Sequence, residues 1–221
     1  MEIITPLQKE ILKIFPEIED SNAFYLTGGT ALAAFYLTHR KSNDLDFFTG
    51  EENILTPFSF RLEKKLRDQQ INTERRRGLH SFVELVVNKG DESTLIHIAQ
   101  DAPFRLEPPI ELPEFPGLKI DSLVDIASNK LLALFQRATL RDFIDIYFLI
   151  KENHFTSEKL IKLAKEKDPG FELYWLGVAF ERINVFSFDS PDMLLLIKPC
   201  AMKDLLSLFN NWRAELAKEL Q

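Results

Sequence analysis

Two short segments of the chain carry residues whose types and spacing suit phosphate chemistry. Gly28, Gly29 and Thr30 are consecutive, and Asp44 and Asp46 lie two residues apart in a segment that alternates polar and apolar side chains. Such alternation predicts a strand, on which residues two apart point to the same face. A pair of carboxylates on one face can hold two divalent metal ions about 3.5–4 Å apart, which activate an attacking oxygen and stabilise a leaving oxygen.

The glycine pair lies between a predicted strand and a predicted helix, where it can receive a phosphate. Glycines let backbone N–H groups approach an anion closely, and the start of a helix favours negative charge. Thr30 can cap that helix or donate its hydroxyl to a phosphate. Carboxylates favour hard ions such as Mg²⁺ (or Mn²⁺), which also bind substrate phosphates. Together the segments predict nucleotidyl transfer: Gly28, Gly29 and Thr30 hold the triphosphate of an NTP, and Asp44 and Asp46 hold the metal.

These residues fall in an N-terminal part that is expected to mix strands and helices. Strands are expected at 24–26, 44–48, 82–87 and 94–99, the last two as a hairpin, and helices at 6–15, 30–38 and 57–70. Prolines cluster at 103–117, and a helix capped by Asp121 or Ser122 follows. Helical patterns then dominate, over 121–137, 140–152, 157–167, 171–184 and 201–219. We therefore expect two domains, 1–120 and 121–221.

Composition narrows the class of protein. The 221 residues are 45% hydrophobic and 28% charged, which is typical of a globular chain that buries a core without cross-links. The single cysteine, Cys200, excludes an intramolecular disulfide and a cysteine-rich zinc site. The first four residues lack the features of a signal peptide, and no apolar run approaches about 18 residues. We expect a cytoplasmic protein without a membrane span.

Net charge bears on the kind of partner. The chain has 27 basic and 34 acidic residues, a net charge of −7, which argues against a general nucleic-acid coat protein. Residues 58–80, however, hold seven basic and three acidic side chains, in an expected helix followed by the run Arg75-Arg76-Arg77. An RNA would therefore be bound locally, through phosphate contacts to this segment. The other interpretation is a charged helix surface followed by a polar turn.

Two blocks of the sequence resemble those of a known family. The first block is Leu26-Thr27-Gly28-Gly29-Thr30-Ala31-Leu32 and His39-Arg40-x-Ser42-x-Asp44-Leu45-Asp46-Phe47-Phe48; the second is Asn129-Lys130-Leu131-Leu132-Ala133-Leu134, Arg137 and Arg141-Asp142-Phe143-x-Asp145-Ile146-Tyr147-x-Leu149. Together they resemble the AbiEii/AbiGii abortive-infection nucleotidyltransferase toxins, within the DNA polymerase β-like nucleotidyltransferase superfamily. The resemblance implies an α+β fold, in which a nucleotidyltransferase domain with a mixed sheet is followed by a helical domain.

The resemblance also assigns roles to the second block. Lys130 would contact a nucleotide phosphate, and an acidic residue would complete the active site, for which Asp145 is a better candidate than Asp142. Arg137 and Asp142 are expected to contribute to nucleotide binding, with Lys130, Arg137 and Arg141 on one face if their helix is continuous. The other interpretations are a solvated helix face, and an Asp142 that caps a helix or pairs with Arg137 or Arg141.

Two further residues lie just before the aspartate pair. Arg40 and Ser42 are expected to contribute to nucleotide binding, Arg40 by positioning a phosphate or pairing with a catalytic aspartate. A structural salt bridge is an equally good interpretation of Arg40.

The third carboxylate of the polymerase β-like pattern is missing from its expected strand. The run Thr94–Asp101 places His97 at the inward position. Imidazole is a poorer ligand for Mg²⁺ than a carboxylate, but it can serve as a base. Three interpretations follow: His97 replaces the acid, Asp101 or Glu84 supplies it from nearby, or the enzyme is weakened or inactive.

The resemblance makes the 3′ end of tRNA the leading acceptor, bound through residues 58–80. It further implies a toxin of a bacterial toxin–antitoxin or phage-defence system, with a cognate antitoxin as partner. One alternative is the same chemistry on a protein or a small molecule. The other is a degenerate transferase that acts as a binding or regulatory module, because of the missing third acid.

Overall fold

The computed structural model describes residues 3–219, which form two compact units. The first unit holds the residues up to Tyr36 together with Lys41–Ser122, and the second holds Leu37–Arg40 and the residues from Leu123 onward. The expected boundary between 120 and 121 places no earlier residue in the helical part. The structure places 37–40 there because the His39 carbonyl accepts hydrogen bonds from the backbone N–H groups of Ile197 and Lys198.

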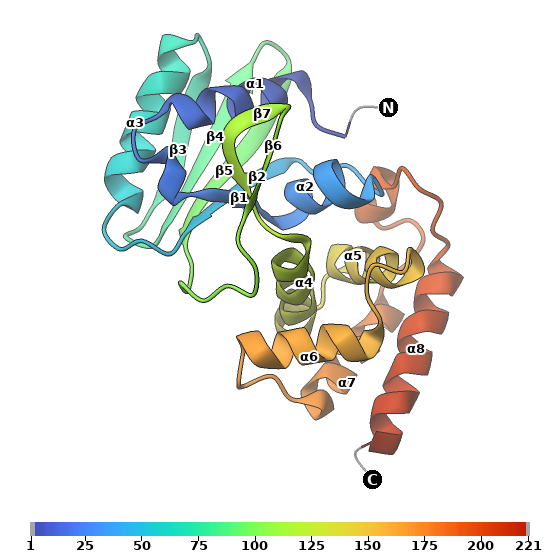
Figure 1. The fold of residues 1–221 in the computed structure, drawn as a ribbon. Helices are drawn as coiled ribbons and strands as arrows, with labels where there is room; N and C mark the ends of the chain where they lie inside the picture. The colour runs from blue at the N-terminus through green and yellow to red at the C-terminus, as the bar shows by residue number, and fades with distance from the viewer. Residues whose placement is uncertain (1–2, 220–221) are drawn as a thin grey trace. The chain divides into compact units, whose positions relative to one another are not determined.

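The first unit is built on one mixed sheet of seven strands, as the α+β expectation requires (Figure 1). The strands are β1 (Tyr25–Thr27), β2 (Asp44–Thr49), β3 (Asn72–Gly78), β4 (Phe82–Lys89), β5 (Glu92–Gln100), β6 (Ile110–Leu112) and β7 (Phe115–Ile120). Their order is β3-β4-β5-β2-β1-β7-β6. The pairs β1–β7 and β2–β5 are parallel, and the other neighbours are antiparallel.

Three strands were not anticipated from the sequence. β3 replaces the polar turn expected after the basic helix, and β6 and β7 occupy the proline-rich segment. Both β3 and β6 are edge strands with a single neighbour. Edge strands carry charged residues and prolines more freely than central ones, so their apolar alternation is weak.

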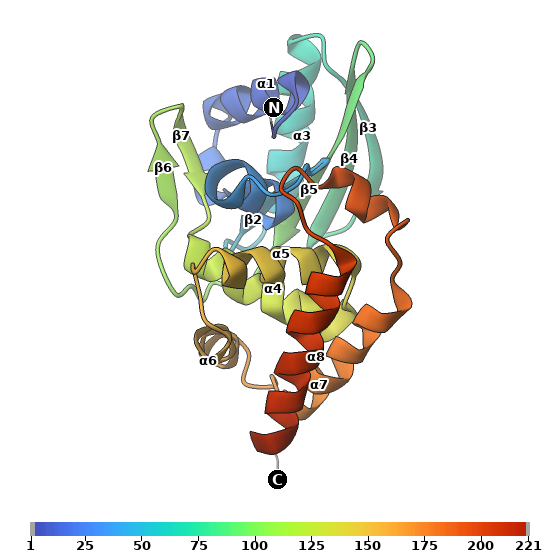
Figure 2. The same ribbon diagram turned by 90° about the vertical axis from the view of Figure 1, so that its right-hand side faces the viewer.

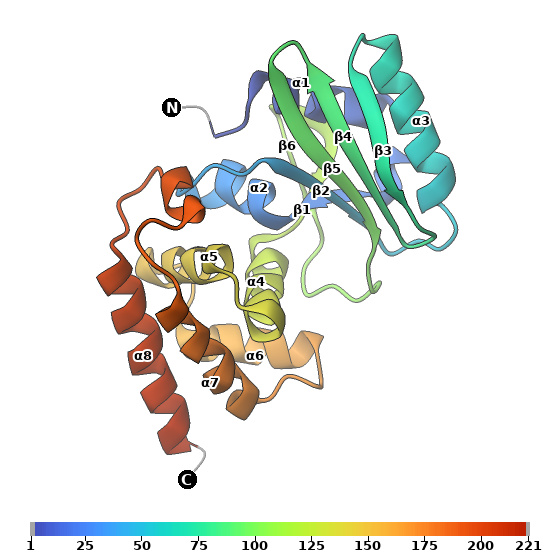
Figure 3. The same cartoon turned by 180° about the vertical axis from the view of Figure 1, so that it is seen from behind.

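Helices α1 (Pro6–Ile14) and α3 (Leu55–Asp68) cover one face of the sheet (Figure 3). Thr5 and Gln8 form a capping box that starts α1. The core beneath these helices is aromatic: the rings of Phe15 and Phe47 stack 3.8 Å apart, and those of Phe24 and Phe58 lie 4.1 Å apart. Short 3₁₀ turns at Phe15–Glu17 and Ser21–Ala23 follow α1.

The alternation of β2 divides its side chains between the two faces. Leu45 and Phe47 are fully buried under the helices, while Asp44 and Asp46 are half-buried on the opposite face. Between β1 and β2 the chain forms α2 (Gly28–Leu32), which continues as a π-helical turn over Ala33–Leu37. The hydrophobic alternation predicted from the sequence therefore decides which face of the sheet carries the carboxylates.

The second unit is a bundle of five helices with two 3₁₀ turns (Figure 2). They are α4 (Leu123–Arg137), α5 (Leu140–Lys151), α6 (Ser157–Lys167), α7 (Leu173–Glu181), Arg182–Val185, Pro191–Leu195 and α8 (Met202–Glu219). α4 packs against α5, α6 and α7, and α8 packs against α5 and α7. Aromatic contacts fill the core, with the ring of Phe209 4.8 Å from Phe143 and 5.2 Å from Phe180.

Lys130 and Arg137 lie on α4, whereas Arg141 lies on α5. α4 ends at Arg137, Ala138 adopts a positive φ of 46°, and Thr139 caps α5. The condition for a shared face, a continuous helix, is therefore not met, in agreement with the separate helices expected over 121–137 and 140–152. Within residues 3–219, no helix has the length and apolar character needed to cross a membrane.

Candidate active site

The glycine turn and the aspartate strand meet through β1 and β2. Thr27, the residue before the turn, pairs with Asp46 in the antiparallel ladder. Gly28 has a φ of 72°, and a methyl group built on it would overlap the Asp46 carboxylate. Thr30, fully buried, donates its hydroxyl to the Asp44 carbonyl. The two segments singled out in the sequence thus form one local structure, in which only glycine fits at position 28.

Asp44 and Asp46 are the candidate donors for a metal ion. Both lie on the same face of β2, and the Asp46 side chain is 23% exposed. Among residues 3–219, no group of three or more His, Cys, Asp or Glu side chains is arranged to hold a metal. Mg²⁺ is commonly bound by one or two carboxylates together with substrate phosphates. The aspartate pair therefore fits an ion whose remaining ligands come from a nucleotide.

His97 lies beside this pair on β5. It is registered with Asp46 on one side and Glu84 of β4 on the other. Its Nδ1 lies 2.9 Å from Asp46 Oδ1, and its Nε2 lies 3.5 Å from Glu84 Oε2. The hydrogen bond to Asp46, with the charges of Asp44 and Glu84, raises the pKa of His97 although burial opposes this. The arrangement favours an imidazolium that donates to Asp46.

Glu84 and Asp101, the other candidates for the third acid, differ in their surroundings. Glu84 shares the row and the face of His97. Asp101 follows the last residue of β5 and accepts a hydrogen bond of 3.0 Å from the Tyr25 hydroxyl. Of the two carboxylates, Glu84 is the one placed beside His97.

Asp145 forms a buried ionic cluster in the second unit. Its fully buried carboxylate lies 2.7 Å from His39 Nε2, 2.7 Å from Arg40 Nε and 2.7 Å from Lys130 Nζ. Burial alone would raise the pKa of Asp145, but the charges of Arg40 and Lys130 outweigh it and hold this pKa well below its ordinary value. Burial lowers the pKa of His39, although its hydrogen bond to Asp145 opposes this.

The cluster accounts for three residues that were assigned to the site. Arg40 makes the salt bridge that was the alternative interpretation, through both Nε and Nη2. Lys130 is 8% exposed, and its amine is held by Asp145. The catalytic role of Asp145 and the nucleotide-binding roles of Arg40 and Lys130 stay predictions. Ser42, also buried, offers its carbonyl to the Gln8 side chain at 3.1 Å, and its role likewise stays a prediction.

Asp142 and Arg137 contact one another at the start of α5. The Asp142 carboxylate accepts two hydrogen bonds from Arg137, of 3.0 and 2.9 Å, and further ones from the backbone and hydroxyl of Thr139. Burial would raise the pKa of Asp142, but these donors lower it. This is the capping and pairing arrangement that was the other interpretation of Asp142. Arg141 instead lies 3.4 Å from Asp192.

One buried carboxylate was not recognised in the sequence as part of this region. Asp121 or Ser122 was expected to cap the following helix; the Asp121 carboxylate accepts a hydrogen bond of 2.7 Å from the Thr27 hydroxyl and pairs with Arg105. Tyr36 donates to its carbonyl at 2.7 Å. These contacts hold the end of β1 just before the glycine turn. Strand β7 ends directly before Asp121, so recognising this strand in the sequence would have indicated the position of Asp121. The proline and glycine residues of β7 obscured its strand pattern.

The sequence of this chain is similar to those of known proteins. Residues 10–172 match the family model described as nucleotidyl transferase AbiEii toxin, type IV TA system. The uncharacterised protein aq_aa25 of Aquifex aeolicus (strain VF5) is 33% identical over 168 residues, which cover 72% of this chain and 73% of that protein.

Two solved structures share the fold. JHP933 from Helicobacter pylori is 20% identical, with coverage of 96% of this chain and 91% of that chain and a TM-score of 0.55. MenT4, the nucleotidyltransferase toxin Rv2826c from Mycobacterium tuberculosis H37Rv, is 18% identical, with coverage of 96% and 82% and a TM-score of 0.61.

Proposed function

This chain belongs to the AbiEii family of nucleotidyl transferase toxins, and we propose that Asp44 and Asp46 carry its nucleotidyl transfer by holding Mg²⁺ (or Mn²⁺) against an NTP. The observation that supports this most is the contact between Asp46 and the turn at Gly28. A phosphate bound by the backbone N–H groups of Gly28 and Gly29 would lie next to the Asp46 carboxylate.

The reaction transfers a nucleoside monophosphate to a hydroxyl. The acceptor oxygen forms a bond to the α-phosphorus, the bond from that phosphorus to the bridging oxygen breaks, and pyrophosphate leaves with the electron pair. A divalent ion at the aspartate pair supplies charge neutralisation for the triphosphate. Gly28 and Gly29 orient the phosphates, and His97 fixes the Asp46 carboxylate by donating from Nδ1. The hydroxyl proton passes to solvent or to a base beside Asp46.

The proposed acceptor is the 3′ end of a tRNA, and the biological role is that of a toxin in a bacterial toxin–antitoxin or phage-defence system. Both steps rest on the family and on the basic segment 58–80. A cognate antitoxin would be the protein partner, and the cytoplasm the site of action. A protein or small-molecule acceptor is the alternative within the same chemistry.

Label transfer tests this proposal. The protein is incubated with total tRNA and each α-labelled NTP in turn, with Mg²⁺ or Mn²⁺, and labelled tRNA is expected with at least one NTP. Asp44→Ala and Asp46→Ala should abolish the transfer, whereas Asp68→Ala, which removes an exposed carboxylate of α3, should not. Transfer that survives Asp44→Ala and Asp46→Ala would refute the site assignment, and label on an added protein instead of tRNA would refute the acceptor.

A degenerate transferase is a second candidate, and one observation favours it. His97 stands in the row where a third carboxylate was expected, with both ring nitrogens directed at carboxylates. In that case Mg²⁺ and NTP would neither raise the melting temperature nor give a labelled product with any acceptor.

A further inference from the structure

A β-bulge divides the arginines of β3 between the two faces of the sheet. Regular alternation would put Arg75 and Arg77 on one face. In the ladder with β4, however, Arg75 pairs with Leu85 while Arg77 pairs with Glu84, and Arg76 is the extra residue. Because Leu85 and Glu84 are consecutive, Arg75 and Arg77 lie on opposite faces. Bulges of this kind commonly re-aim a side chain.

The side chain of Arg75 lies on the face of the sheet that α3 covers. Its Nε donates to Glu63 at 2.7 Å and its Nη2 to Ser59 at 2.9 Å, both on α3. Its guanidinium also lies 4.2 Å from the ring centre of Phe60. These contacts occupy Arg75 and fasten the edge strand to the helix.

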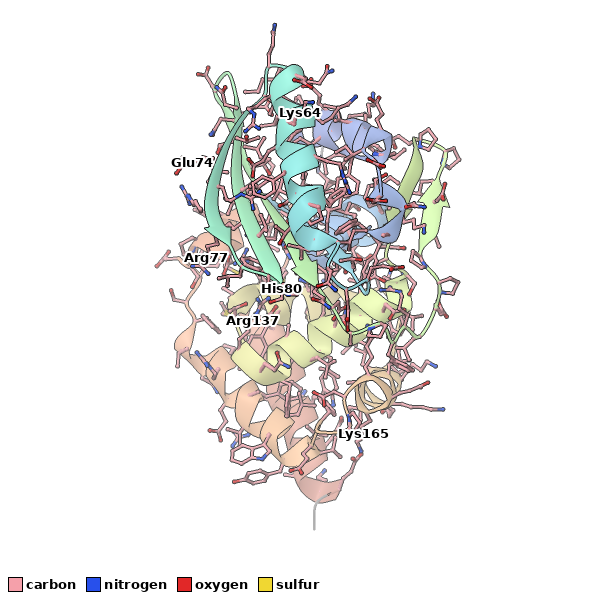
Figure 4. The ribbon with its side chains drawn as sticks, turned by 90° about the vertical axis from the view of Figure 1, so that its left-hand side faces the viewer. Lys64, Glu74, Arg77, His80, Arg137 and Lys165 are labelled. Atoms are coloured by element: carbon pink, nitrogen blue, oxygen red, sulfur yellow. The ribbon has the colours of Figure 1, made fainter. Side chains whose placement is uncertain are left out.

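Arg77 lies on the same face of the sheet as the aspartate pair. The register runs Arg77–Glu84–His97–Asp46 across β3, β4, β5 and β2, and registered residues share a face. Figure 4 shows Arg77 and Glu74 on the side of β3 that is turned away from α3. Three strand spacings separate Arg77 from Asp46, about 14 Å between backbones. Arg77 is therefore on the face of the proposed reaction but too far away to hold the triphosphate at Asp46.

Most other cations of residues 58–80 already have acidic partners. Arg61 pairs with Asp20 and Glu19, Lys65 with Glu17, and Arg67 with Glu63, as Arg75 does. Within the described part of the chain, no ion pair is found for Lys64, Arg76 or Arg77. Of these three, Arg77 is the one whose register places it in line with Asp46. The net positive charge of residues 58–80 therefore overstates the number of cations that can bind a polyanion.

An aromatic side chain accompanies Arg77 on this face. Phe82 lies two residues before Glu84 on β4, so both point the same way, and it is only half-buried. Its ring centre is 5.6 Å from that of His97. A cation that takes a backbone phosphate and an aromatic ring that stacks a base are the combination that binds single-stranded nucleic acid.

We propose that Arg77 binds a backbone phosphate of a single-stranded RNA end, with Phe82 stacking one of its bases, so that the terminal hydroxyl lies at Asp46. We call Arg77 and Phe82 the acceptor track. This proposal rests on the proposed function and names residues that bind the RNA acceptor. An acidic protein segment would use the cation of Arg77 alone and leave Phe82 without a role. For this reason the observations favour RNA.

Binding of a labelled single-stranded RNA oligonucleotide, followed by fluorescence anisotropy over a series of salt concentrations, tests the track without metal or NTP. Arg77→Ala should weaken binding several-fold and make the slope of log K against log salt shallower by about 0.7, the effect of one lost phosphate contact. Arg77→Lys should restore most of the slope. Phe82→Leu should weaken binding and leave the slope unchanged, because it removes no charge.

Arg67→Ala is the matched control. It removes the same charge from the same segment, but from an arginine already paired with Glu63 on the helix side of the sheet. It should leave affinity and slope close to wild type. Equal losses in the Arg67 and Arg77 variants would overturn the proposal, as would an unchanged slope in Arg77→Ala or displacement of the RNA by a poly-glutamate peptide at equal charge.

The outcome is separable from that of the proposed function. If the RNA track is wrong, the Arg77 variant binds RNA like wild type while labelled product still forms. If the nucleotidyl transfer is wrong, no label is transferred, yet the difference between the Arg77 and Arg67 variants in RNA binding remains.

Discussion

The imidazole of His97 donates from Nδ1 to Oδ1 of Asp46 across two parallel strands, at 2.9 Å. This hydrogen bond fixes one oxygen of the carboxylate that packs against the turn at Gly28. Removing a group that orients a metal-binding carboxylate typically lowers metal affinity or activity by about 10- to 100-fold. His97 is therefore placed to orient Asp46.

Replacing His97 with alanine should reduce label transfer by about 10- to 100-fold and raise the Mg²⁺ concentration needed for half-maximal activity. The reason is that Asp46 loses its donor. His97→Asn, whose amide can still donate, should recover part of the activity. Equal activity of wild type and His97→Ala, measured over a range of Mg²⁺ concentrations, would exclude an orienting role.

Gly28→Ala should abolish label transfer and destabilise the protein. The new methyl group overlaps the Asp46 carboxylate, and alanine is strained at a φ of 72°. Gly90→Ala is the matched control, because Gly90 also has a positive φ, of 59°, but faces open space. Urea unfolding should show a cost of about 1 kcal/mol for Gly90→Ala from backbone strain alone. The larger cost expected for Gly28→Ala measures the steric conflict, and equal costs would argue against it.

Asp145→Ala should be among the most destabilising substitutions in the chain. It removes the buried carboxylate with which Arg40 and Lys130 both pair, and removing one partner of a buried ion pair typically costs about 3–5 kcal/mol. Glu10→Ala breaks an exposed pair with Lys89 and should cost less than about 1 kcal/mol. Urea unfolding monitored by circular dichroism distinguishes the two. A small effect of Asp145→Ala would mean that water or another anion reaches the cluster.

Stability should fall on acidification through Asp142 and Asp145. The pKa of each carboxyl is lower in the folded protein than its ordinary value of 3.8. A lowered pKa contributes stability above the unfolded value, and the contribution is lost as pH falls through the folded value. Unfolding free energies measured between pH 7 and about 3 should therefore decrease from about pH 5 downward. Asp142→Asn should flatten this decrease, and an unchanged profile would contradict the assignment.

Local sequence patterns were sufficient for much of the fold. The alternation around Asp44–Phe48 and the hairpin of β4 and β5 are both present, because each depends on neighbouring residues and turn chemistry. The break after Arg137 was expected from the separate helical patterns over 121–137 and 140–152, and the structure confirms it, with Ala138 between the two helices. Ala138 has a positive φ, and the capping box of Thr139 and Asp142 begins the next helix directly after it.

The edge strand β3 shows why long-range contacts escape such patterns. Its run of arginines gives no apolar alternation. On the face turned toward α3, position 75 is an arginine that donates to Glu63 and not an apolar residue. The pairing of that arginine with Glu63 involves residues twelve positions apart on two different elements. Nothing in the sequence order specifies this contact.

By itself the sequence determined the family, the strand–turn–helix around Gly28 and the shared face of Asp44 and Asp46, because side-chain type and a period of two fix these locally. Only the tertiary structure decided the partners: His97 beside Asp46, the burial of Asp145 among His39, Arg40 and Lys130, and the face on which Arg77 lies. The physical reason is that the environment of a charged side chain depends on the oppositely charged groups that surround it. Those groups come from strands and helices that the chain brings together only on folding.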